Sequence, residues 1–504
     1  MSIATTTAGV VRGTEDNGVQ RFAGIPYAAP PTGERRWRPP APAEPWSGER
    51  DATEFGATAH QNADMLSMLL GLDQEPRSED CLFLNVWTPA AADGKRPVMV
   101  WIHGGAFMIG SGSMGLYDGS TFVRRGDVVV VTINYRLGEL GFLELGSIDP
   151  DYEGSGNVGL LDQVAALEWV RDNIAAFGGD PDCVTIFGES AGGMSVSTLL
   201  AMPAADGLFH RAIAQSGAGQ GVATRQEADR VAAAYLERQG VTSVAELAAR
   251  TPAQLMEAQA AIFAEMLTNP DSMISSGDAM SGMPFRPSVD GTIVPTAVDT
   301  ALRAGASAGV PLLTGTNADE WKLFDMMDAT SMDDAELTKR FGALAPDGAK
   351  ALDAYRRAHP DLGSKDLFSA FMTDIAFRIP AIRMLEAQRE ATDQVWSYLF
   401  SWVTPAMGGA LGSCHGLEVP FVFDVVDDPK LAMFVGAEAP VGLADTMQDA
   451  WIAFARTGSP VTDELADWPA YDANRRVTLE FAAECRLVDD PEALLRQFWE
   501  STAG

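Results

Sequence analysis

The chain has 504 residues, of which 46% are hydrophobic and 21% charged, and its formal net charge is −33 at pH 7. This composition is typical of a globular protein with a sizeable core, and the negative charge excludes nucleic acids as partners because it repels phosphate backbones. No apolar run approaches the roughly 18 residues of a membrane span, and no basic region precedes an apolar one at the N-terminus, so we expect no membrane association, no signal peptide and a cytoplasmic location.

The predicted elements alternate between strands and helices. Short alternating runs at 9–13 and 19–22 indicate a small N-terminal hairpin. Apolar runs then predict central strands at residues 82–88, 98–102, 128–133, 183–187, 211–215, 311–315 and 395–402. A helix beginning near Asn157 shows apolar residues at helical spacing. Strands joined by crossover helices predict an α/β fold with a central, mostly parallel sheet flanked by helices.

The strand at 98–102 opens into a glycine-rich loop that contains His103, Gly104, Gly105 and Ala106. Glycines allow backbone N–H groups to turn toward a small target, so this loop is a candidate oxyanion hole. His103 is then expected to shape the loop rather than to act as a base.

The most informative motif is G-x-S-x-G at residues 188–192, between the strand at 183–187 and a helix predicted at 193–202. In a nucleophile elbow, small flanking residues permit a sharp strand-to-helix turn that projects the serine hydroxyl. Ser190 is therefore the predicted nucleophile, and the N–H of Ala191 is a further predicted oxyanion donor.

A serine nucleophile needs a base, and the chain has only five histidines. His359 lies at a charged helix end, where we expect a surface residue. His415 lies in a loop of small residues at 412–416, which can bring an imidazole close to another backbone. Because the base follows both the nucleophile and the acid in chains with this kind of elbow, His415 is the predicted base.

The acid is expected after the strand at 311–315, because the carboxyl ends of parallel strands face one crevice. Asp319 and Glu320 both lie there, and spacing alone does not separate them. Either residue is also suited to cap the helix predicted near Trp321.

Together these motifs resemble those of the type-B carboxylesterases, the cholinesterase-like branch of the α/β-hydrolases. The resemblance extends over nearly the whole chain, through segments at 22–27, 79–87, 134–136, 156–163, 188–192, 315–320 and 415–416. It implies an α/β-hydrolase fold in which residues 1–504 form a single catalytic domain. Helical insertions at about 220–285 and 320–390 would form a gorge, and no metal or organic cofactor is needed.

The resemblance also assigns the catalytic roles. It implies Glu320 as the acid of a triad with Ser190 and His415. The implied oxyanion donors are the N–H groups of Gly105, Ala106 and Ala191. Ala106 stands where many relatives carry glycine, but only its backbone N–H is required.

Other residues receive supporting roles from the resemblance. Two structural ion pairs are implied, Arg38 with Glu79 and Arg136 with Asp162. Ser216 resembles a serine that hydrogen-bonds the triad acid. Glu189 is expected in a buried polar network rather than as a base.

The segment before Cys81 departs from the eukaryotic relatives. Residues 57–62 lack the cysteine that pairs with the equivalent of Cys81 in those relatives, so we expect a free thiol, and neither a disulfide nor a zinc site. An apolar stretch at 65–70 is expected to form a lid. No tryptophan lies between Trp46 and Trp87, which argues against a quaternary-ammonium substrate.

The function implied by the resemblance is a serine carboxylesterase that hydrolyses neutral, moderately apolar esters through an acyl-enzyme. Carbamate, amide or lipid hydrolysis by the same triad remains an alternative. A non-catalytic cholinesterase-like binding protein is another, although such proteins typically lose a triad residue and all three are present here. The partner is then a small-molecule ester, and the protein is a monomer or a small homo-oligomer.

Overall fold

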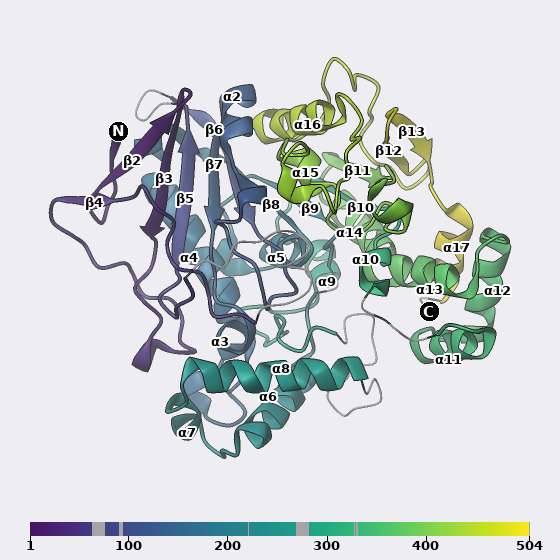
Figure 1. The fold of residues 1–504 in the computed structure, drawn as a ribbon, viewed down its shortest axis with the longest axis horizontal. Coiled ribbons are helices and arrows are strands. Elements are labelled where there is room, and N and C mark those ends of the chain that lie inside the picture. Colours follow the sequence, from purple (N-terminus) through teal and green to yellow (C-terminus); the bar gives the residue numbers. More distant parts are fainter. Residues whose placement is uncertain are drawn as a thin grey trace.

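The computed structural model describes residues 1–62, 76–89, 94–219, 221–268, 282–326, 328 and 331–502. Through this part of the chain runs a 13-stranded sheet with the order β1-β2-β3-β5-β7-β6-β8-β9-β10-β11-β12-β13, and β4 pairs with β2 (Figure 1). The strands are β1 (Ser2–Thr5), β2 (Val10–Asp16), β3 (Val19–Pro26), β4 (Glu49–Asp51), β5 (Phe83–Thr88), β6 (Arg96–Ile102), β7 (Val129–Ile133), β8 (Gly179–Glu189), β9 (Arg211–Gln215), β10 (Leu312–Asn317), β11 (Val395–Phe400), β12 (Val477–Phe481) and β13 (Arg486–Asp489).

The predicted central strands correspond one by one to β5 through β11. From β7 to β12 in the spatial order, each neighbouring pair is parallel, whereas the pairs from β1 to β7 and the pair β12–β13 are antiparallel. The predicted α/β fold with a mostly parallel sheet is confirmed. The N-terminal hairpin is also present, but as β2 and β3 within the main sheet rather than as a separate unit.

Both faces of the central strands are buried, which explains why these strands are continuously apolar in the sequence. On β6, Val98, Val100 and Ile102 belong to one apolar cluster, and Met99 and Trp101 belong to the other. Residues of α4 (Val158–Asn173), α5 (Ala191–Leu199) and α14 (Ile379–Arg389) complete the first cluster, and those of α2 (Ser120–Gly126), α15 (Val419–Val422) and α16 (Leu443–Thr457) complete the second. Helix α4 is the helix predicted to begin near Asn157, and α5 is the predicted elbow helix.

The two predicted helical insertions are present as separate groups of helices (Figure 1). The first comprises α6 (Arg225–Gln239), α7 (Val244–Ala248) and α8 (Pro252–Thr268). The second comprises α10 (Lys322–Asp325), α11 (Asp334–Leu344), α12 (Gly348–Ala358), α13 (Ser364–Thr373), a π-helical turn (Asp374–Arg378) and α14. Helix α17 (Ala493–Thr502) shares an apolar cluster with α11, α12 and α13. The predicted lid at 65–70 lies outside the described residues, and the gorge remains a prediction.

A buried carboxylate lies where α3 (Gly138–Phe142) meets the first insertion. Glu139 has no exposed surface, and neither of its carboxylate oxygens has a hydrogen-bond partner within the described residues. Its backbone N–H donates to the Gln259 side chain of α8 over 3.2 Å. Burial raises the pKa of Glu139 to about 8 because the ionised form is poorly solvated.

We predict that Glu139→Gln makes the free energy of unfolding depend less on pH between pH 5 and pH 8. The folded wild type binds the Glu139 proton more tightly than the unfolded chain does, so its stability falls as the pH rises from about 4.5 to about 8. Glutamine does not titrate, so the variant lacks this loss. The free energy of unfolding of the variant minus that of the wild type should therefore increase by about 2–4 kcal/mol over this range. Urea unfolding at pH 5 and pH 8 measures both proteins. An equal difference between them at the two pH values would contradict the assignment.

Candidate active site

Ser190 lies at the sharp turn from β8 into α5, as predicted. Its backbone angles are φ 57° and ψ −124°, a strained conformation for a residue with a side chain. Glycines make the turn sterically feasible, because a Cβ on Gly192 would lie 1.9 Å from the backbone oxygen of Ile102 and one on Gly188 would lie 2.6 Å from the same atom. The Ser190 N–H donates to the backbone oxygen of Gln215 over 3.0 Å. The elbow is thus locked between β6 and β9.

The glycine-rich loop after β6 lies directly beside Ser190. A Cβ on Gly104 would lie 3.1 Å from the Ser190 Cβ. Gly105 and Ala106 have φ values of 110° and 53°, which turn the peptide groups of the loop. Within the described residues, no backbone or side-chain group accepts a hydrogen bond from the N–H of Gly105 or Ala106. Ala191 is the first residue of α5, where N–H groups have no acceptor inside the helix.

His103 has the loop-shaping environment that the sequence indicated. Its ring stacks on Tyr135 with centroids 4.5 Å apart, and Nδ1 lies 2.8 Å from the backbone oxygen of Gly104. Burial lowers the pKa of His103 to about 4, so the ring is neutral at physiological pH. Of the other histidines, His359 lies at the C-terminal end of α12. Its ring is 3.8 Å from Glu492, which is not a residue of this site.

The structure brings His415 and Glu320 together. His415 Nδ1 lies 2.6 Å from Glu320 Oε2, and the two residues are 5% and 0% exposed. The backbone N–H of Asn317, at the end of β10, donates to the other oxygen of Glu320 over 2.7 Å. The geometry also separates the two acids that spacing left open. Asp319 pairs with Lys322 at 3.0 Å and accepts the Ser413 N–H, so it does not contact the ring.

The other ring nitrogen of His415 faces Glu189 rather than Ser190. Nε2 lies 3.1 Å from Glu189 Oε1, although neither atom meets the angular requirements of a hydrogen bond within the described residues. No hydrogen bond joins the Ser190 hydroxyl to the His415 ring in the described part of the chain. The predicted relay is therefore formed on the Glu320 side and open on the Ser190 side. Glu189 does lie in a buried polar cluster, as expected.

Three carboxylates control the protonation of His415. Burial alone would lower the pKa of the ring, but the charges of Glu189, Glu320 and Glu418 and the hydrogen bond to Glu320 outweigh it and raise the pKa to about 9. Burial also raises the pKa of Glu189, reinforced by Glu418 and Glu320, while His415 opposes the rise. A proton is thus retained between His415 and Glu189 at neutral pH.

Ser216 does not have the role that the resemblance implied. Its hydroxyl is buried without a hydrogen-bond partner among the described residues, while its backbone N–H donates to Gly315. The donor to Glu320 Oε1 is instead the backbone N–H of Asn317. Asn317 also donates its side-chain amide to Glu418 over 2.7 Å. The sequence analysis missed Asn317 and Glu418, because their contact joins the end of β10 to the start of α15 across about 100 residues of sequence.

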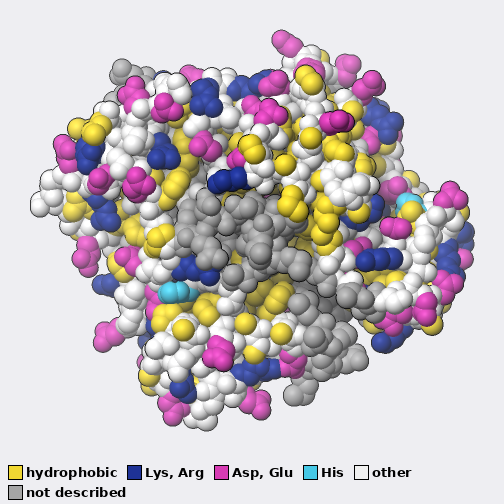
Figure 2. All heavy atoms as spheres, in the orientation of Figure 1, with side chains coloured by type: hydrophobic (Ala, Val, Ile, Leu, Met, Phe, Trp, Pro, Cys, Tyr) yellow, Lys and Arg dark blue, Asp and Glu magenta, His cyan; other side chains and the backbone are white. Residues whose placement is uncertain are grey.

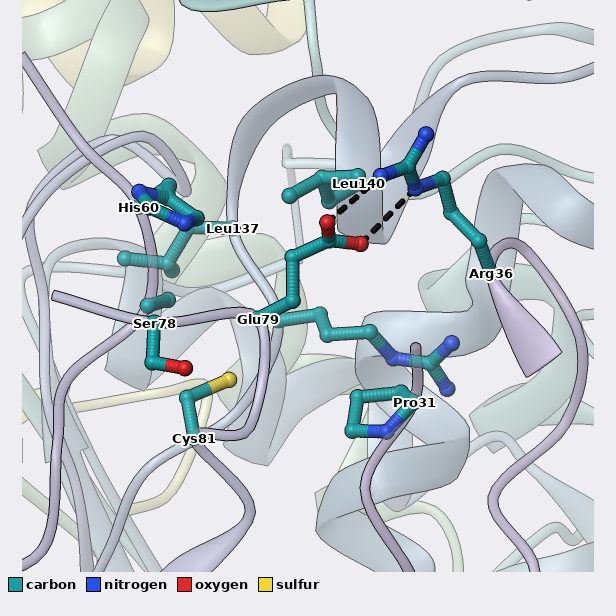
Figure 3. A pocket seen from close by; sticks show the side chains of 10 residues that line it. Pro31, Arg36, His60, Ser78, Glu79, Cys81, Leu137 and Leu140 are labelled. Carbon is teal, nitrogen blue, oxygen red and sulfur yellow. Dashed lines mark hydrogen bonds and ion pairs between the residues drawn. The ribbon is translucent and has the colours of Figure 1, made fainter. Parts of the chain in front are cut away.

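The implied pair of Arg38 with Glu79 is wrong, because Arg36 occupies that place. Arg36 Nε and Nη2 lie 2.7 Å and 2.5 Å from the two Glu79 oxygens (Figure 3). Its Nη1 donates to the backbone oxygens of Ala248 and Arg250. Arg38 instead stacks on Tyr152 and donates to the backbone oxygen of Asp151. The 3-10 turn at Gly33–Arg35 directs Arg36 inward, a local geometry that motif spacing does not reveal.

Glu79 borders a small pocket, which His60, Ser78 and Cys81 also line (Figure 3). None of the three proposed triad residues lines it. Cys81 is a free thiol, and burial raises its pKa well above the ordinary value, so it is not a reactive thiolate at neutral pH. Arg136 forms the second implied pair, with Nε 2.7 Å from Asp162 Oδ2 and Nη2 2.6 Å from Oδ1.

Two aromatic residues that the sequence analysis missed border His415. The ring centroids of Phe377 and Phe324 lie 4.8 Å and 5.2 Å from that of His415. Phe377 belongs to the π-helical turn at Asp374–Arg378, and such turns are frequent at functional sites. Within the described ranges, no group of three or more His, Cys, Asp or Glu is arranged to hold a metal ion. No described helix has the length and apolarity needed to span a bilayer.

Comparison with known proteins shows similarity to carboxylesterases over nearly the whole chain. The model of the carboxylesterase family matches residues 1–499. A para-nitrobenzyl esterase of Bacillus subtilis (strain 168) is 42% identical over 500 residues, which cover 98% of each chain. A phenmedipham hydrolase of Pseudarthrobacter oxydans is 36% identical over 484 residues, covering 94% of this chain and 93% of the relative. A solved Geobacillus stearothermophilus carboxylesterase aligns with a TM-score of 0.87 at 40% identity, covering 99% of this chain and 100% of the other.

The sheet described above, with its elbow serine after a parallel strand, is that of an α/β-hydrolase, and its structural neighbours share this class. Within that class the chain belongs to the carboxylesterase family. It is accordingly a serine carboxylesterase, a carboxylic ester hydrolase of type B.

We predict that Arg36→Met and Arg38→Met have different effects on stability. Side chains in the Arg36–Glu79 pair are only 10% and 12% exposed, so removing the cation leaves a buried carboxylate without its partner. The free energy of unfolding should fall by about 3–5 kcal/mol for Arg36→Met and by no more than about 1 kcal/mol for Arg38→Met. Denaturant unfolding of both variants measures this. A larger fall in the free energy of unfolding for Arg38→Met than for Arg36→Met would support the pairing of Arg38 with Glu79 instead.

Proposed function

We propose that Ser190, His415 and Glu320 hydrolyse carboxylic esters by a two-step acyl transfer. Ser190 attacks the ester carbonyl while His415 takes its proton, and His415 then donates that proton to the leaving alcohol. Water repeats the sequence on the acyl-enzyme. The observation that supports this most directly is the 2.6 Å contact between His415 Nδ1 and a fully buried Glu320, because it fixes the ring with Nε2 as the catalytic nitrogen.

The N–H groups of Gly105, Ala106 and Ala191 are proposed to hold the oxyanion. Their position in the loop beside the Ser190 Cβ and at the start of α5 supports the role. Fixed backbone donors of this kind act without reorganisation when charge develops, and losing one typically costs about 10²–10³ in kcat.

The reactive state requires the proton between His415 and Glu189 to leave. With Nδ1–H donated to Glu320, the neutral ring can only accept at Nε2, so it repels an ionised Glu189 and attracts the Ser190 hydroxyl. We therefore propose that Glu189 holds a resting arrangement and that the ring turns to Ser190 in the reactive one. Catalytic hydrogen bonds are often long in enzymes without substrate and tighten when substrate binds.

The proposed substrates are neutral esters of moderate apolarity. Phe324 and Phe377 supply apolar surface beside the catalytic ring, and three carboxylates close to it disfavour an anionic substrate. On the face shown in Figure 2, hydrophobic side chains form several separate groups, and most Asp and Glu side chains lie toward the edge of the face. Carbamates, amides and lipids stay alternative substrates for the same triad. The cytoplasmic location and the oligomeric state stay predictions.

We predict that Ser190→Ala lowers kcat for a nitrophenyl acyl ester by at least about 10⁴-fold while the melting temperature changes by no more than about 2 °C. Removing the hydroxyl deletes the nucleophile but no hydrogen bond found among the described residues. An organophosphonate should label the wild type stoichiometrically and the variant not at all. A wild type that resists labelling would point to a binding protein instead, and an active variant would refute the nucleophile.

We predict that activity falls as the pH drops through the His415 pKa, which lies well above the ordinary value. In Glu189→Gln one carboxylate that stabilises the imidazolium is absent, so the acid limb of the kcat/KM profile should move to lower pH, by about one pH unit. The measurement is the full pH–rate profile of both proteins. An acid limb that stays in place, or moves to higher pH, would show that Glu189 does not control the ring.

A further inference from the structure

Gln215, the last residue of β9, contacts both halves of the proposed catalytic apparatus. Its backbone oxygen accepts the Ser190 N–H over 3.0 Å. Its side-chain Nε2 donates to Glu418 Oε1 over 3.3 Å, and Glu418 follows His415 by three residues at the start of α15. A single buried residue therefore connects the nucleophile elbow to a carboxylate beside the base.

Trp451 of α16 determines which way the Gln215 amide points. Its indole Nε1, which can only donate, lies 3.0 Å from Gln215 Oε1, so the amide nitrogen faces Glu418. A reversed amide would place its oxygen against the carboxylate and leave the indole N–H without an acceptor. Both changes are unfavourable here because Gln215, Glu418 and Trp451 have no exposed surface.

Glu418 is a buried carboxylate that receives hydrogen bonds from amides. Besides Gln215, the Asn317 side chain donates to its Oε2 over 2.7 Å, and the backbone N–H of Asn317 donates to Glu320. These donors favour the ionised form of Glu418. The titratable groups that interact with Glu418 are His415, Glu320, Glu189, Tyr398, Tyr117 and Cys414.

We propose that Gln215 is a positioning residue for ester hydrolysis, which holds the Ser190 elbow and the Glu418 carboxylate in one fixed relation, and that Trp451 keeps its amide in the orientation this requires. The inference rests on the proposed function. It extends the apparatus from the triad to α16, on the face of the sheet opposite α5.

Removing the Gln215 amide is expected to raise the pKa of Glu418 and to lower the pKa of His415. Glu418 loses a donor to its ionised form, so its pKa rises and it carries less negative charge at a given pH. Since Glu418 is one of the carboxylates that raise the pKa of His415, the pKa of the ring falls. The acid limb of kcat/KM therefore moves to lower pH, while kcat falls because the elbow and the base are no longer held together.

The test uses Gln215→Met, which keeps the length of the side chain and removes its hydrogen bonds, and Trp451→Phe, which removes the indole donor together with part of the ring. Gln388→Met is the matched control, because Gln388 is also fully buried and donates to two backbone oxygens, those of Ser307 and Val310. Trp396→Phe is the second control, since the buried Trp396 Nε1 has no partner among the described residues. The measurements are pH profiles of kcat and kcat/KM for a nitrophenyl ester.

We expect both test variants to shift the acid limb to lower pH by about 0.5 units and to lower kcat about tenfold, with KM within about twofold of wild type. Both controls should keep the wild-type profile. An unchanged profile in Gln215→Met and Trp451→Phe, or an equal shift in Gln388→Met, would overturn the inference. If the wild type reacts with an organophosphonate and the test variants have the wild-type pH profiles, only this inference fails. If the wild type does not react, the proposed function itself fails.

Discussion

The hydrogen bond between His415 and Glu320 is the interaction on which the rest of the site depends. It joins a loop after β11 to the loop after β10, and both groups are removed from water. A carboxylate and an imidazole in such a place stabilise each other, because each lacks the solvent that would otherwise screen it. The sheet makes the contact feasible, since its parallel strands end at one edge and deliver Ser190, Glu320 and the glycine-rich loop to the same region.

Burial gives this arrangement its particular character. Glu189, Glu320 and Glu418 surround one imidazole, so the ring holds a proton far more strongly than a histidine in water does. The same buried charge that orients the proposed base also stabilises its protonated form, which cannot accept the Ser190 proton. Gln215 and Asn317 supply neutral donors to Glu418, and Trp451 holds the Gln215 amide by donating to its oxygen. The carboxylates around the proposed base are therefore also the groups that determine its pKa.

Much of this architecture was predictable because its signals are local. Strands buried on both faces appear as apolar runs, and the elbow appears as G-x-S-x-G, since only small residues fit against Ile102. His415 followed from its loop of small residues and its position after the acid in chain order, and the two candidate acids followed from their place after a strand. The choice between Asp319 and Glu320 needed the family resemblance, and the structure explains it through the Lys322 and Ser413 contacts of Asp319. Arg36, Asn317 and the rings of Phe324 and Phe377 were missed because their roles arise from contacts between distant segments.

The direction of the His415 ring is the feature that most needs direct measurement. The account requires Nε2 to leave Glu189 and accept the Ser190 hydroxyl once the retained proton is gone. A crystal structure determined at a pH above the His415 pKa of about 9 would show this. The account predicts a distance from His415 Nε2 to Ser190 Oγ of no more than about 3.2 Å, with the Glu320 contact intact. A ring that still faces Glu189, with Ser190 Oγ beyond about 4 Å, would contradict it.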